Sequence, residues 1–266
     1  MFDQQSSEIL DSTIQLVRKA SAFIFDNINK VNSEDIEEKS MNSLVSFVDK
    51  EAENILVAGL SKIIPNCGFI TEEDTEDDDN KEYVWIIDPL DGTTNFLKKI
   101  PHFAVSVALQ HNGETVMGIV KEVNSGEEWT AIIGKGAHLN NEPIKVTSSS
   151  YKDCIIATGF PYSNEFNYDQ QFNVIRHWLT ETRGMRRIGS AALDLCYVAC
   201  GRFGAYHEAT LNPWDLAAGE LIVREAGGIV TDYNGGSDYL YGKTIIAASN
   251  EIYSSVGPII KKYLAP

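Results

Sequence analysis

Two aspartates follow an apolar run in the segment Trp-Ile-Ile-Asp-Pro-Leu-Asp at residues 85–91. The apolar run predicts a buried strand that ends at Asp88. Pro89 keeps the backbone of Asp88 extended and presets the first central residue of a β-turn. If residues 88–91 form that turn, the carboxylates of Asp88 and Asp91 converge, with the carbonyl group of Leu90 between them. The segment therefore predicts a cluster of oxygen ligands.

The residues after Asp91 are suited to bind an anion. Gly92 lets the backbone approach a ligand closely, and the N–H groups of Gly92, Thr93 and Thr94 can form a concave anion site. Oxygen ligands beside phosphate-binding amides suit Mg²⁺, which binds a few carboxylates, waters and a substrate phosphate. A plain turn is the alternative interpretation, because Asp, Pro and Gly are all favoured in turns.

Further acids occur at two distant places in the sequence. Glu72 follows the apolar run 69–71, where it could be a metal ligand or a solvated strand end. The segment Asn-Pro-Trp-Asp at 212–215 predicts the start of a helix, with Asn212 at the N-cap and Asp215 in the first turn. An acid at that position stabilises the helix dipole, and it could also bind a cation where a phosphate offsets the dipole.

Charge and composition exclude several classes of protein. The 266 residues include 22 Lys and Arg against 38 Asp and Glu, a formal net charge of −16. This excess argues against nucleic-acid binding, and a phosphate substrate would need bound cations. No apolar run approaches the roughly 18 residues that span a bilayer, and the N-terminus lacks signal-peptide features. We therefore expect a cytoplasmic protein without a membrane partner, and its four scattered cysteines predict reduced thiols.

Hydrophobic periodicity and turn residues predict the elements that must position these acids. We expect helices at residues 6–30, 44–62, 169–182, 191–199, 213–226 and 251–263. We expect strands at residues 68–71, 83–87, 103–110, 115–122, 127–133, 154–158, 205–208 and 244–248, and a loop at residues 31–43. The pattern changes near residue 150, which predicts two α/β halves, residues 1–150 and 151–266, with a site in the crevice between them.

Taken together, these segments resemble the inositol monophosphatase family of Mg²⁺-dependent, lithium-sensitive phosphatases. The matching segments are Glu72-Glu73, residues 85–96, Gly-Lys-Gly-Ala at 134–137, residues 186–195, Pro-Trp-Asp-Leu-Ala-Ala-Gly at 213–219 and Glu-Ala-Gly-Gly at 225–228. The similarity extends from about residue 8 to residue 263. It implies an α/β (α+β) fold, the layered αβαβα sandwich of inositol monophosphatases and sugar phosphatases.

The resemblance implies a role for each of these residues. The implied metal ligands are Glu72, Asp88, the carbonyl of Leu90, Asp91 and Asp215. The implied catalytic residues, which would orient the attacking water, are Glu72, Thr93 and Asp49. The implied substrate-binding residues are Asp91, Gly92, Thr93, Gly189, Ser190, Ala191, Glu208 and Asp215. Without the resemblance, Glu208 could equally be a surface acid at a strand end.

The activity implied by the resemblance is hydrolysis of inositol monophosphate or a similar sugar-alcohol phosphate. A water activated by one of two to three Mg²⁺ ions would attack the phosphorus directly. The same site could instead belong to a 3′(2′),5′-bisphosphate nucleotidase, a fructose-1,6-bisphosphatase or a histidinol-phosphatase. A regulatory binding protein on the same fold is the non-enzymatic alternative, and the resemblance also implies a homodimer.

The sequence departs from the family pattern at two places. Ser-Leu-Val-Ser at 43–46 precedes Asp49, where the family often has Asp-Leu-Val-Thr, and this leaves details of the metal loop open. Gly204 stands where an Asp is usual, which leaves open the polarity of the pocket or the packing beside it. Arg186 and Arg187 are expected to be solvated at the surface.

Overall fold

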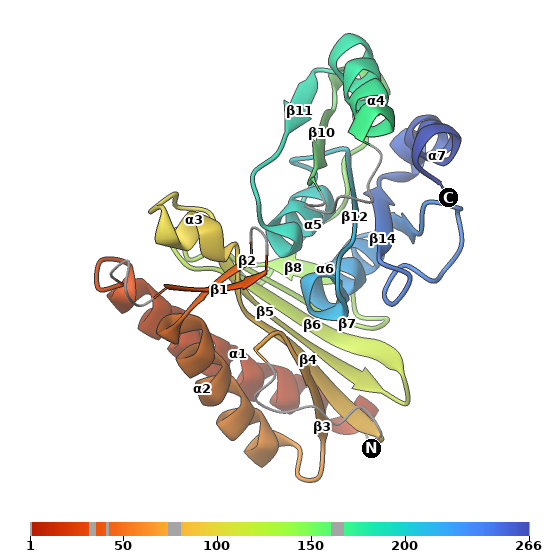
Figure 1. Cartoon of the computed structure of the whole chain (residues 1–266). Helices are drawn as coiled ribbons and strands as arrows, with labels where there is room; N and C mark the ends of the chain where they lie inside the picture. The colour runs from red at the N-terminus through yellow and green to blue at the C-terminus, as the bar shows by residue number, and fades with distance from the viewer. Residues whose placement is uncertain (1, 32–35, 41–42, 74–80, 161–167, 266) are drawn as a thin grey trace.

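The computed structural model describes residues 2–31, 36–40, 43–73, 81–160 and 168–265, arranged as alternating layers of helices and sheets (Figure 1). The helices that form three of the layers are α1 (Phe2–Asn27), α2 (Phe47–Ile63), α4 (Tyr168–Glu181), α5 (Ala191–Ala199), α6 (Pro213–Glu225) and α7 (Asn250–Leu264). A short helix, α3 (Thr93–Leu97), lies outside these layers.

Two sheets form the remaining layers. The first has the strand order β3 (Gly68–Thr71), β4 (Tyr83–Asp91), β5 (Ala104–His111), β6 (Glu114–Glu122), β7 (Glu128–Ile132), β8 (Ala137–Leu139), β9 (Glu142–Pro143). The second has the strand order β11 (Gly184–Arg186), β10 (Ile155–Thr158), β12 (Ala205–Ala209), β14 (Thr244–Ala248), β13 (Ile229–Thr231). In the first sheet β3 and β4 are parallel, and in the second β10 is parallel to both neighbours.

Buried apolar side chains separate the layers. Helices α1 and α2 cover one face of the first sheet, α5 and α6 pack between the two sheets, and α4 and α7 cover the outer face of the second. The order of layers is therefore αβαβα, and the α/β sandwich implied by the sequence is confirmed. The division at residue 150 stays a prediction, because the middle helices share one core with both sheets.

Helix α6 approaches the first sheet closely at Gly118 of β6. A Cβ atom at Gly118 would lie 2.7 Å from the carbonyl oxygen of Ala218, so only glycine allows this backbone contact. The contact fixes α6 against the sheet. It therefore helps to place Asp215, which lies in the first turn of α6.

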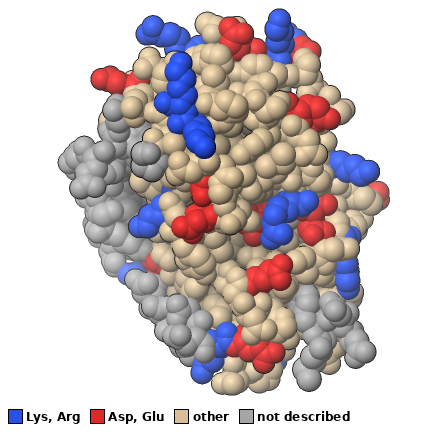
Figure 2. Space-filling model, turned by 90° about the vertical axis from the view of Figure 1, so that its right-hand side faces the viewer, with Lys and Arg blue, Asp and Glu red and all other residues tan. Residues whose placement is uncertain are grey.

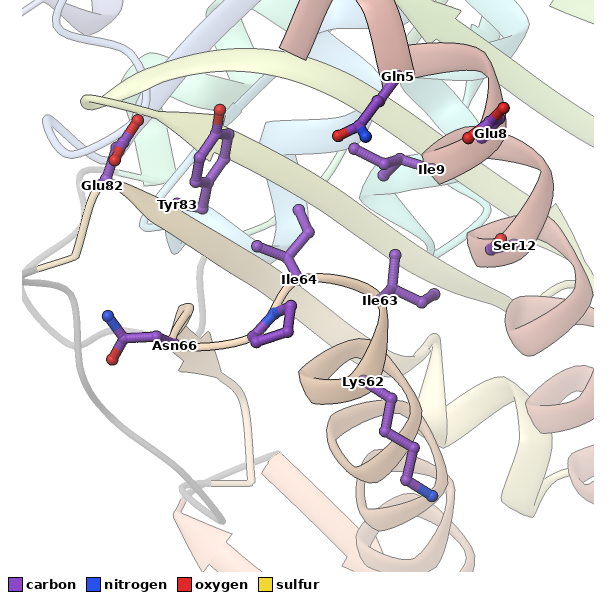
Figure 3. Close-up of a pocket in the computed structure, with 11 residues that line it drawn as sticks. Gln5, Glu8, Ile9, Ser12, Lys62, Ile63, Ile64, Asn66, Glu82 and Tyr83 are labelled. Atoms are coloured by element: carbon purple, nitrogen blue, oxygen red, sulfur yellow. The ribbon is translucent and has the colours of Figure 1, made fainter. Parts of the chain in front are cut away.

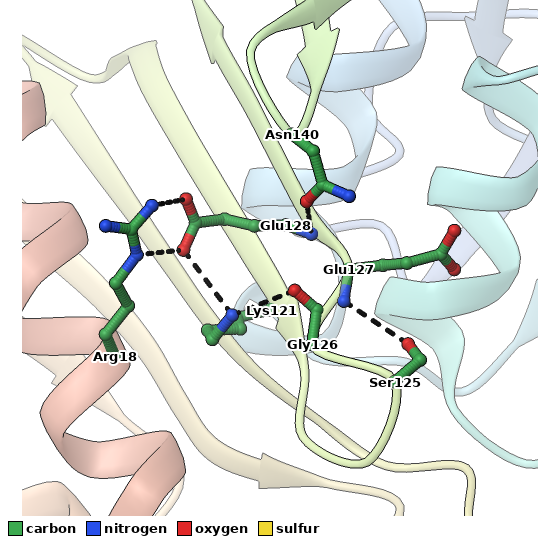
Figure 4. A network of polar contacts seen from close by, with 7 residues as sticks. All are labelled: Arg18, Lys121, Ser125, Gly126, Glu127, Glu128 and Asn140. Atoms are coloured by element: carbon green, nitrogen blue, oxygen red, sulfur yellow. Dashed lines mark hydrogen bonds and ion pairs between the residues drawn. The ribbon is translucent and has the colours of Figure 1, made fainter.

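An ion-pair network joins α1 to the first sheet (Figure 4). The guanidinium group of Arg18 donates to both carboxylate oxygens of Glu128, with N···O distances of 3.0 and 2.9 Å. The ammonium group of Lys121 lies 3.6 Å from the same carboxylate. Glu128 is buried, so its negative charge needs these two partners.

The loop predicted at residues 31–43 is wrong in part. Strand β1 (Ile36–Ser40) pairs antiparallel with β2 (Ser43–Ser46), and α2 begins at Phe47 rather than at residue 44. Ser46 sets the start of α2, because its hydroxyl accepts the N–H of Val48 while Asp49 accepts the N–H of Ser46. Strands β8, β9, β11 and β13 and helix α3 were not predicted, since they are too short to show a period.

The β-turn predicted at residues 88–91 is also wrong. Strand β4 continues to Asp91, and its register against β5 shifts between Asp88, opposite Ser106, and Asp91, opposite Ala104. Three steps along β4 therefore match two along β5, which is the pattern of a β-bulge. Pairing with β5 has overridden the local turn preference, and the two aspartates still lie at the same end of the strand.

The described chain contains no helix that is both long and apolar enough to cross a bilayer. On the face drawn in Figure 2, Lys and Arg side chains lie interspersed with Asp and Glu side chains.

Candidate active site

Two parallel strands bring acids to one edge of the first sheet. Strand β3 ends at Thr71, opposite Ile87 of β4, so Glu72 and Asp88 follow at neighbouring positions. The N–H of Glu72 donates to the carbonyl of Ile87 at 3.3 Å. Asp91 lies at the end of the same strand, beyond the bulge.

Four acids at this edge influence one another's ionisation. Burial raises the pKa of Asp88 well above its ordinary value, and the negative charges of Glu72, Asp91 and Asp215 raise it further. Burial also raises the pKa of Asp215, again with the charges of Glu72 and Asp91. The structure therefore brings together all four acids that the sequence singled out as candidate ligands.

The chemistry of this set suits a divalent cation. Its donors are oxygens, and no basic side chain is among the causes that shift the pKa of Asp88 or Asp215. Within the described residues, no three acids, histidines or cysteines already stand in a metal-binding arrangement. The neighbouring carboxylates all raise the pKa of Asp88, so a bound divalent cation would offset the repulsion among these acids.

Hydrogen bonds hold Asp91 on the side facing the second sheet. Its Oδ2 atom accepts the hydroxyl of Ser190 at 2.6 Å and the N–H of Ala192 at 2.8 Å. Ser190 is the N-cap of α5, and its hydroxyl also accepts the N–H of Leu193. Burial raises the pKa of Asp91 to about 6, and these donors oppose the increase.

A second group of contacts connects α2 with the end of β4. The hydroxyl of Thr93 lies 3.0 Å from Oδ1 of Asp49 and 3.0 Å from the carbonyl oxygen of Leu90. The N–H of Leu90 donates to Oδ1 of Asp88 at 2.9 Å. Asp49 is buried, and burial raises its pKa while hydrogen bonds from Ser46 and Thr93 oppose the increase. The hydroxyl of Thr93 therefore lies between a buried acid and the carbonyl of Leu90.

The backbone at Gly92 requires glycine. Its φ is 94°, and a Cβ atom would lie 3.1 Å from the carbonyl oxygen of His102 and 3.2 Å from that of Gly189. Helix α3 begins directly after Gly92, and the first N–H groups of a helix have no acceptor inside it. Gly92 and Thr93 can therefore offer amides to an anion, as the sequence predicts.

A pocket of about 120 Å³ opens beside the acids. Its lining residues come from both sheets and from α5 and α6, and they are Asp91, Thr158, Gly159, Arg187, Gly189, Ser190, Ala191, Asp194, Glu208, Leu211 and Asp215. The hydroxyl of Tyr206 donates to Oε2 of Glu208 at 2.5 Å. Burial raises the pKa of Glu208 to about 7, and the positive charge of Arg187 opposes the increase. The pocket therefore has acidic groups on both sides.

The segments that form this site lie within a region of the chain that matches a known protein family. The inositol monophosphatase family matches residues 5–264 of the chain, a range that contains every acid described above. The chain belongs to the inositol monophosphatase family. The membership inferred from the sequence is confirmed, and inositol monophosphatases are generally metal-dependent.

Curated relatives and solved structures are similar over nearly the whole chain. The Nus factor SuhB of Vibrio cholerae is 42% identical over 243 residues, which cover 91% of each chain. That of Escherichia coli K12 is 39% identical over 250 residues, covering 93% of this chain and 94% of the relative.

Among solved structures, the extragenic suppressor protein suhB from Bartonella henselae has a TM-score of 0.90 and 38% identity, covering 96% of this chain and 99% of that chain. An IMPase from Thermotoga maritima has a TM-score of 0.87 and 33% identity, covering 96% and 97%.

Sequence reasoning did not single out one acid of this inositol monophosphatase site. Asp194 of α5 is buried and lines the pocket, and its Oδ1 atom accepts no hydrogen bond within the described part of the chain. Burial and the charges of Glu208 and Asp91 raise its pKa well above the ordinary value. An acid inside the apolar helix 191–199 was the available signal. Arg187, expected at the solvated surface, is exposed but also lines the pocket.

The two departures from the inositol monophosphatase pattern have different consequences. A Cβ atom at Gly204 would overlap Cδ1 of Ile252 and would lie 2.6 Å from Cβ of Cys154. Gly204 is therefore a tightly packed core position, and an Asp would not fit there. Ser46 keeps the hydrogen bonds that hold Asp49 in place.

A larger groove of about 640 Å³ lies between the N-terminal part of α1 and the C-terminal end of α2 (Figure 3). Apolar side chains such as Ile9, Ile64 and Tyr83 line it, and its acids are Glu8 and Glu82. None of the four clustered acids contributes to this groove. The smaller pocket is therefore the candidate active site.

Proposed function

We propose that the protein is a Mg²⁺-dependent phosphomonoesterase that hydrolyses inositol monophosphate or a similar sugar-alcohol phosphate. The observation that carries this proposal is the set of four mutually repelling acids beside the hydrogen-bonded pair of Thr93 and Asp49. Family membership supports it, since every implied ligand is present in the chain. The reaction is attack of water on the phosphorus without a covalent intermediate.

Thr93, Asp49 and Glu72 orient the attacking water. When the hydroxyl of Thr93 donates its hydrogen to Oδ1 of Asp49, its lone pairs can accept a hydrogen from the water. The carboxylate of Glu72 accepts the second hydrogen. Asp49 stays in place because Ser46 donates to its other oxygen from both the backbone N–H, at 2.9 Å, and the hydroxyl, at 2.7 Å.

The phosphate group and the alcohol part of the substrate contact different residues of the site. The amides of Gly92 and Thr93 bind phosphate oxygens, while Gly189, Ser190, Ala191 and Glu208 face the alcohol. The carboxyl oxygens of Glu208 can accept hydrogen bonds from hydroxyl groups, which favours a polyol over a monohydric alcohol. This preference distinguishes sugar-alcohol phosphates from simple aryl phosphates.

The ligands for Mg²⁺ are Glu72, Asp88, the carbonyl of Leu90, Asp91 and Asp215, which hold two to three ions. Bound Mg²⁺ supplies positive charge that neutralises the phosphate and lowers the pKa of water. Inhibition by lithium is part of the proposal. We also propose a homodimer, which light scattering measures.

A substrate panel tests the activity. Phosphate release is measured with inositol 1-phosphate, a 3′,5′-bisphosphate nucleotide, fructose 1,6-bisphosphate and histidinol phosphate, each with Mg²⁺ and with EDTA. We expect Mg²⁺-dependent release and the highest kcat/KM with inositol 1-phosphate. A higher kcat/KM with another member of the panel would change the assigned substrate. If no phosphate is released from any monoester, the proposed phosphatase activity is refuted.

The name of the relatives from Vibrio cholerae and Escherichia coli supports a second candidate function. They are called Nus factors, so this chain would also act as a Nus factor and bind another macromolecule. Pull-down experiments with Asp88→Asn and Asp215→Asn variants separate the two functions. Partner binding that survives the loss of hydrolysis supports a separate role, and binding of no partner by the wild-type chain refutes it.

A further inference from the structure

Gly159 and Glu208 are neighbours at the ends of two parallel strands. Strands β10 and β12 lie side by side (Figure 1), and their register pairs Ala157 with Tyr206 and Thr158 with His207. The next pair in this register is Gly159 and Glu208. Both residues line the small pocket.

The carboxylate of Glu208 occupies the space that a side chain at position 159 would need. A Cβ atom on Gly159 would overlap the carboxyl carbon of Glu208 and both of its oxygens. The position that a Cβ atom would take at Gly159 is therefore already filled by the carboxylate of Glu208. Contacts this short do not occur, so any other residue displaces the carboxylate.

Neither partner can move away easily. Oε2 of Glu208 accepts the hydroxyl of Tyr206 at 2.5 Å, and Tyr206 is completely buried. On the other side, the hydroxyl of Thr158 donates to the carbonyl of His207 at 2.9 Å. The amide of Gln171 donates to the same hydroxyl at 3.1 Å, which ties α4 to the end of β10.

Backbone conformation does not explain the glycine. Gly159 is absent from the described residues that have a positive φ, so an L-amino acid could adopt its backbone. The three atoms nearest to the position of its missing Cβ all belong to the carboxyl group of Glu208. The space that the Glu208 carboxylate needs therefore explains the glycine at position 159, and its backbone conformation does not.

We propose that Gly159 is a positioning residue that determines specificity. Because Gly159 lacks a Cβ atom, it leaves a space, called the seat below, in which the carboxylate of Glu208 faces a hydroxyl group of the substrate alcohol. This inference rests on the proposed phosphatase function and adds to it the residue that positions Glu208. Gly159 acts through Glu208 and touches no reacting atom. The seat holds one carboxylate orientation, which limits the entropy lost when a hydroxyl binds.

A double-mutant cycle tests the seat. Wild type, Gly159→Ala, Glu208→Ala and the double variant are compared by the ratio of kcat/KM for inositol 1-phosphate to kcat/KM for p-nitrophenyl phosphate, which has no hydroxyl. We expect Gly159→Ala to lower this ratio about 10-fold in the wild-type background. In the Glu208→Ala background the same substitution should change the ratio less than about twofold, because the carboxylate is gone. An equal loss in both backgrounds overturns the proposal.

Gly204→Ala is the matched control. It also introduces a Cβ into a space that is already filled, but among Ile252 and Cys154 rather than in the pocket. We expect this variant to lose stability and to keep the substrate ratio of wild type. If Gly204→Ala lowers the ratio as much as Gly159→Ala does, the effect is general damage and the proposal fails.

Unfolding measurements test the contact between Gly159 and Glu208 independently of the proposed phosphatase function. If wild type hydrolyses neither ester, the phosphatase function fails, but the clash is still measurable. Gly159→Ala should lower the melting temperature in the wild-type background and leave it within about 1 °C in the Glu208→Ala background. If Gly159→Ala does not fold, the double variant still should, since it lacks the clashing carboxylate. A double variant that is equally destabilised refutes the seat.

Discussion

The hydroxyl of Ser190 donates a hydrogen bond of 2.6 Å to Oδ2 of Asp91, across 99 residues of sequence. Asp91 ends a strand of the first sheet, and Ser190 caps a helix that packs between the two sheets. This contact sets the orientation of one candidate metal ligand from the far side of the pocket. The positions of the ligands therefore depend on how the two sheets pack.

Ser190→Ala should weaken Mg²⁺ binding. Without the hydroxyl, Asp91 loses a donor that stabilises its charged form and its orientation. We expect the Mg²⁺ concentration at half-maximal activity to rise about 10-fold, as is typical for groups that orient a ligand. A Mg²⁺ titration of the hydrolysis rate measures it, with the exposed Ser254→Ala as control. An unchanged midpoint would show that Ser190 does not support Asp91 in binding.

Thr93→Val should lower kcat by about 10²-fold or more, because misplacing a reacting group such as the attacking water can cost that much. Valine keeps the shape but removes the hydroxyl that lies 3.0 Å from both Asp49 and the Leu90 carbonyl. Thr93→Ser restores the hydroxyl and should keep most of the activity. Steady-state kinetics at saturating Mg²⁺ distinguish the two variants. Equal kcat values for Val and Ser would remove Thr93 from the mechanism.

Asp91→Asn should reduce turnover at least about 10²-fold, because a catalytic metal contributes several kcal/mol to transition-state stabilisation. The amide keeps the size of the side chain, so circular dichroism should show an intact fold. Asp26→Asn, an exposed change on α1, is the control and should have wild-type activity. Near-wild-type turnover by Asp91→Asn would refute the assignment of the metal ligands.

His207 should make the fold less stable in mild acid. It is completely buried; the indole N–H of Trp178 donates to its Nε2 at 3.2 Å, so its own hydrogen is on Nδ1, toward the Tyr233 hydroxyl. Burial lowers the pKa of His207 to about 3, far below the value of about 6.5 in an unfolded chain. Below pH 6.5, His207 therefore binds a proton in the unfolded state but stays neutral in the folded state. The contribution of His207 to stability is present above pH 6.5 and is lost as the pH falls toward 3.

Urea unfolding at pH 7.5 and pH 5 measures this loss. We expect His207 to account for about 2 kcal/mol of the decrease in unfolding free energy between the two values. His207→Gln has no titrating imidazole, so its decrease should be smaller by that amount. The acids of the site titrate in both proteins and cancel in the comparison. The same pH dependence in both proteins would show that His207 is protonated in the folded state.

Much of the site can be read from local sequence rules. The apolar run before Asp88 is the strand β4, and Asn212, Pro213 and Asp215 occupy the N-cap and first turn of α6 as predicted. These features depend on neighbours within a few residues. Asp49 and Glu208 could be named only through the family resemblance, because each meets its partners far along the chain.

The sequence by itself determined the residue types, the strong helices and strands, and the family. The tertiary structure alone decided that residues 88–91 form a bulge, that Asp194 lines the pocket, and that Gly159 makes room for Glu208. The physical reason is the range of the interactions. Capping and periodicity act between residues that are close in sequence, whereas the register of β4 on β5 and of β10 on β12 depends on strands that meet only when the whole chain has packed.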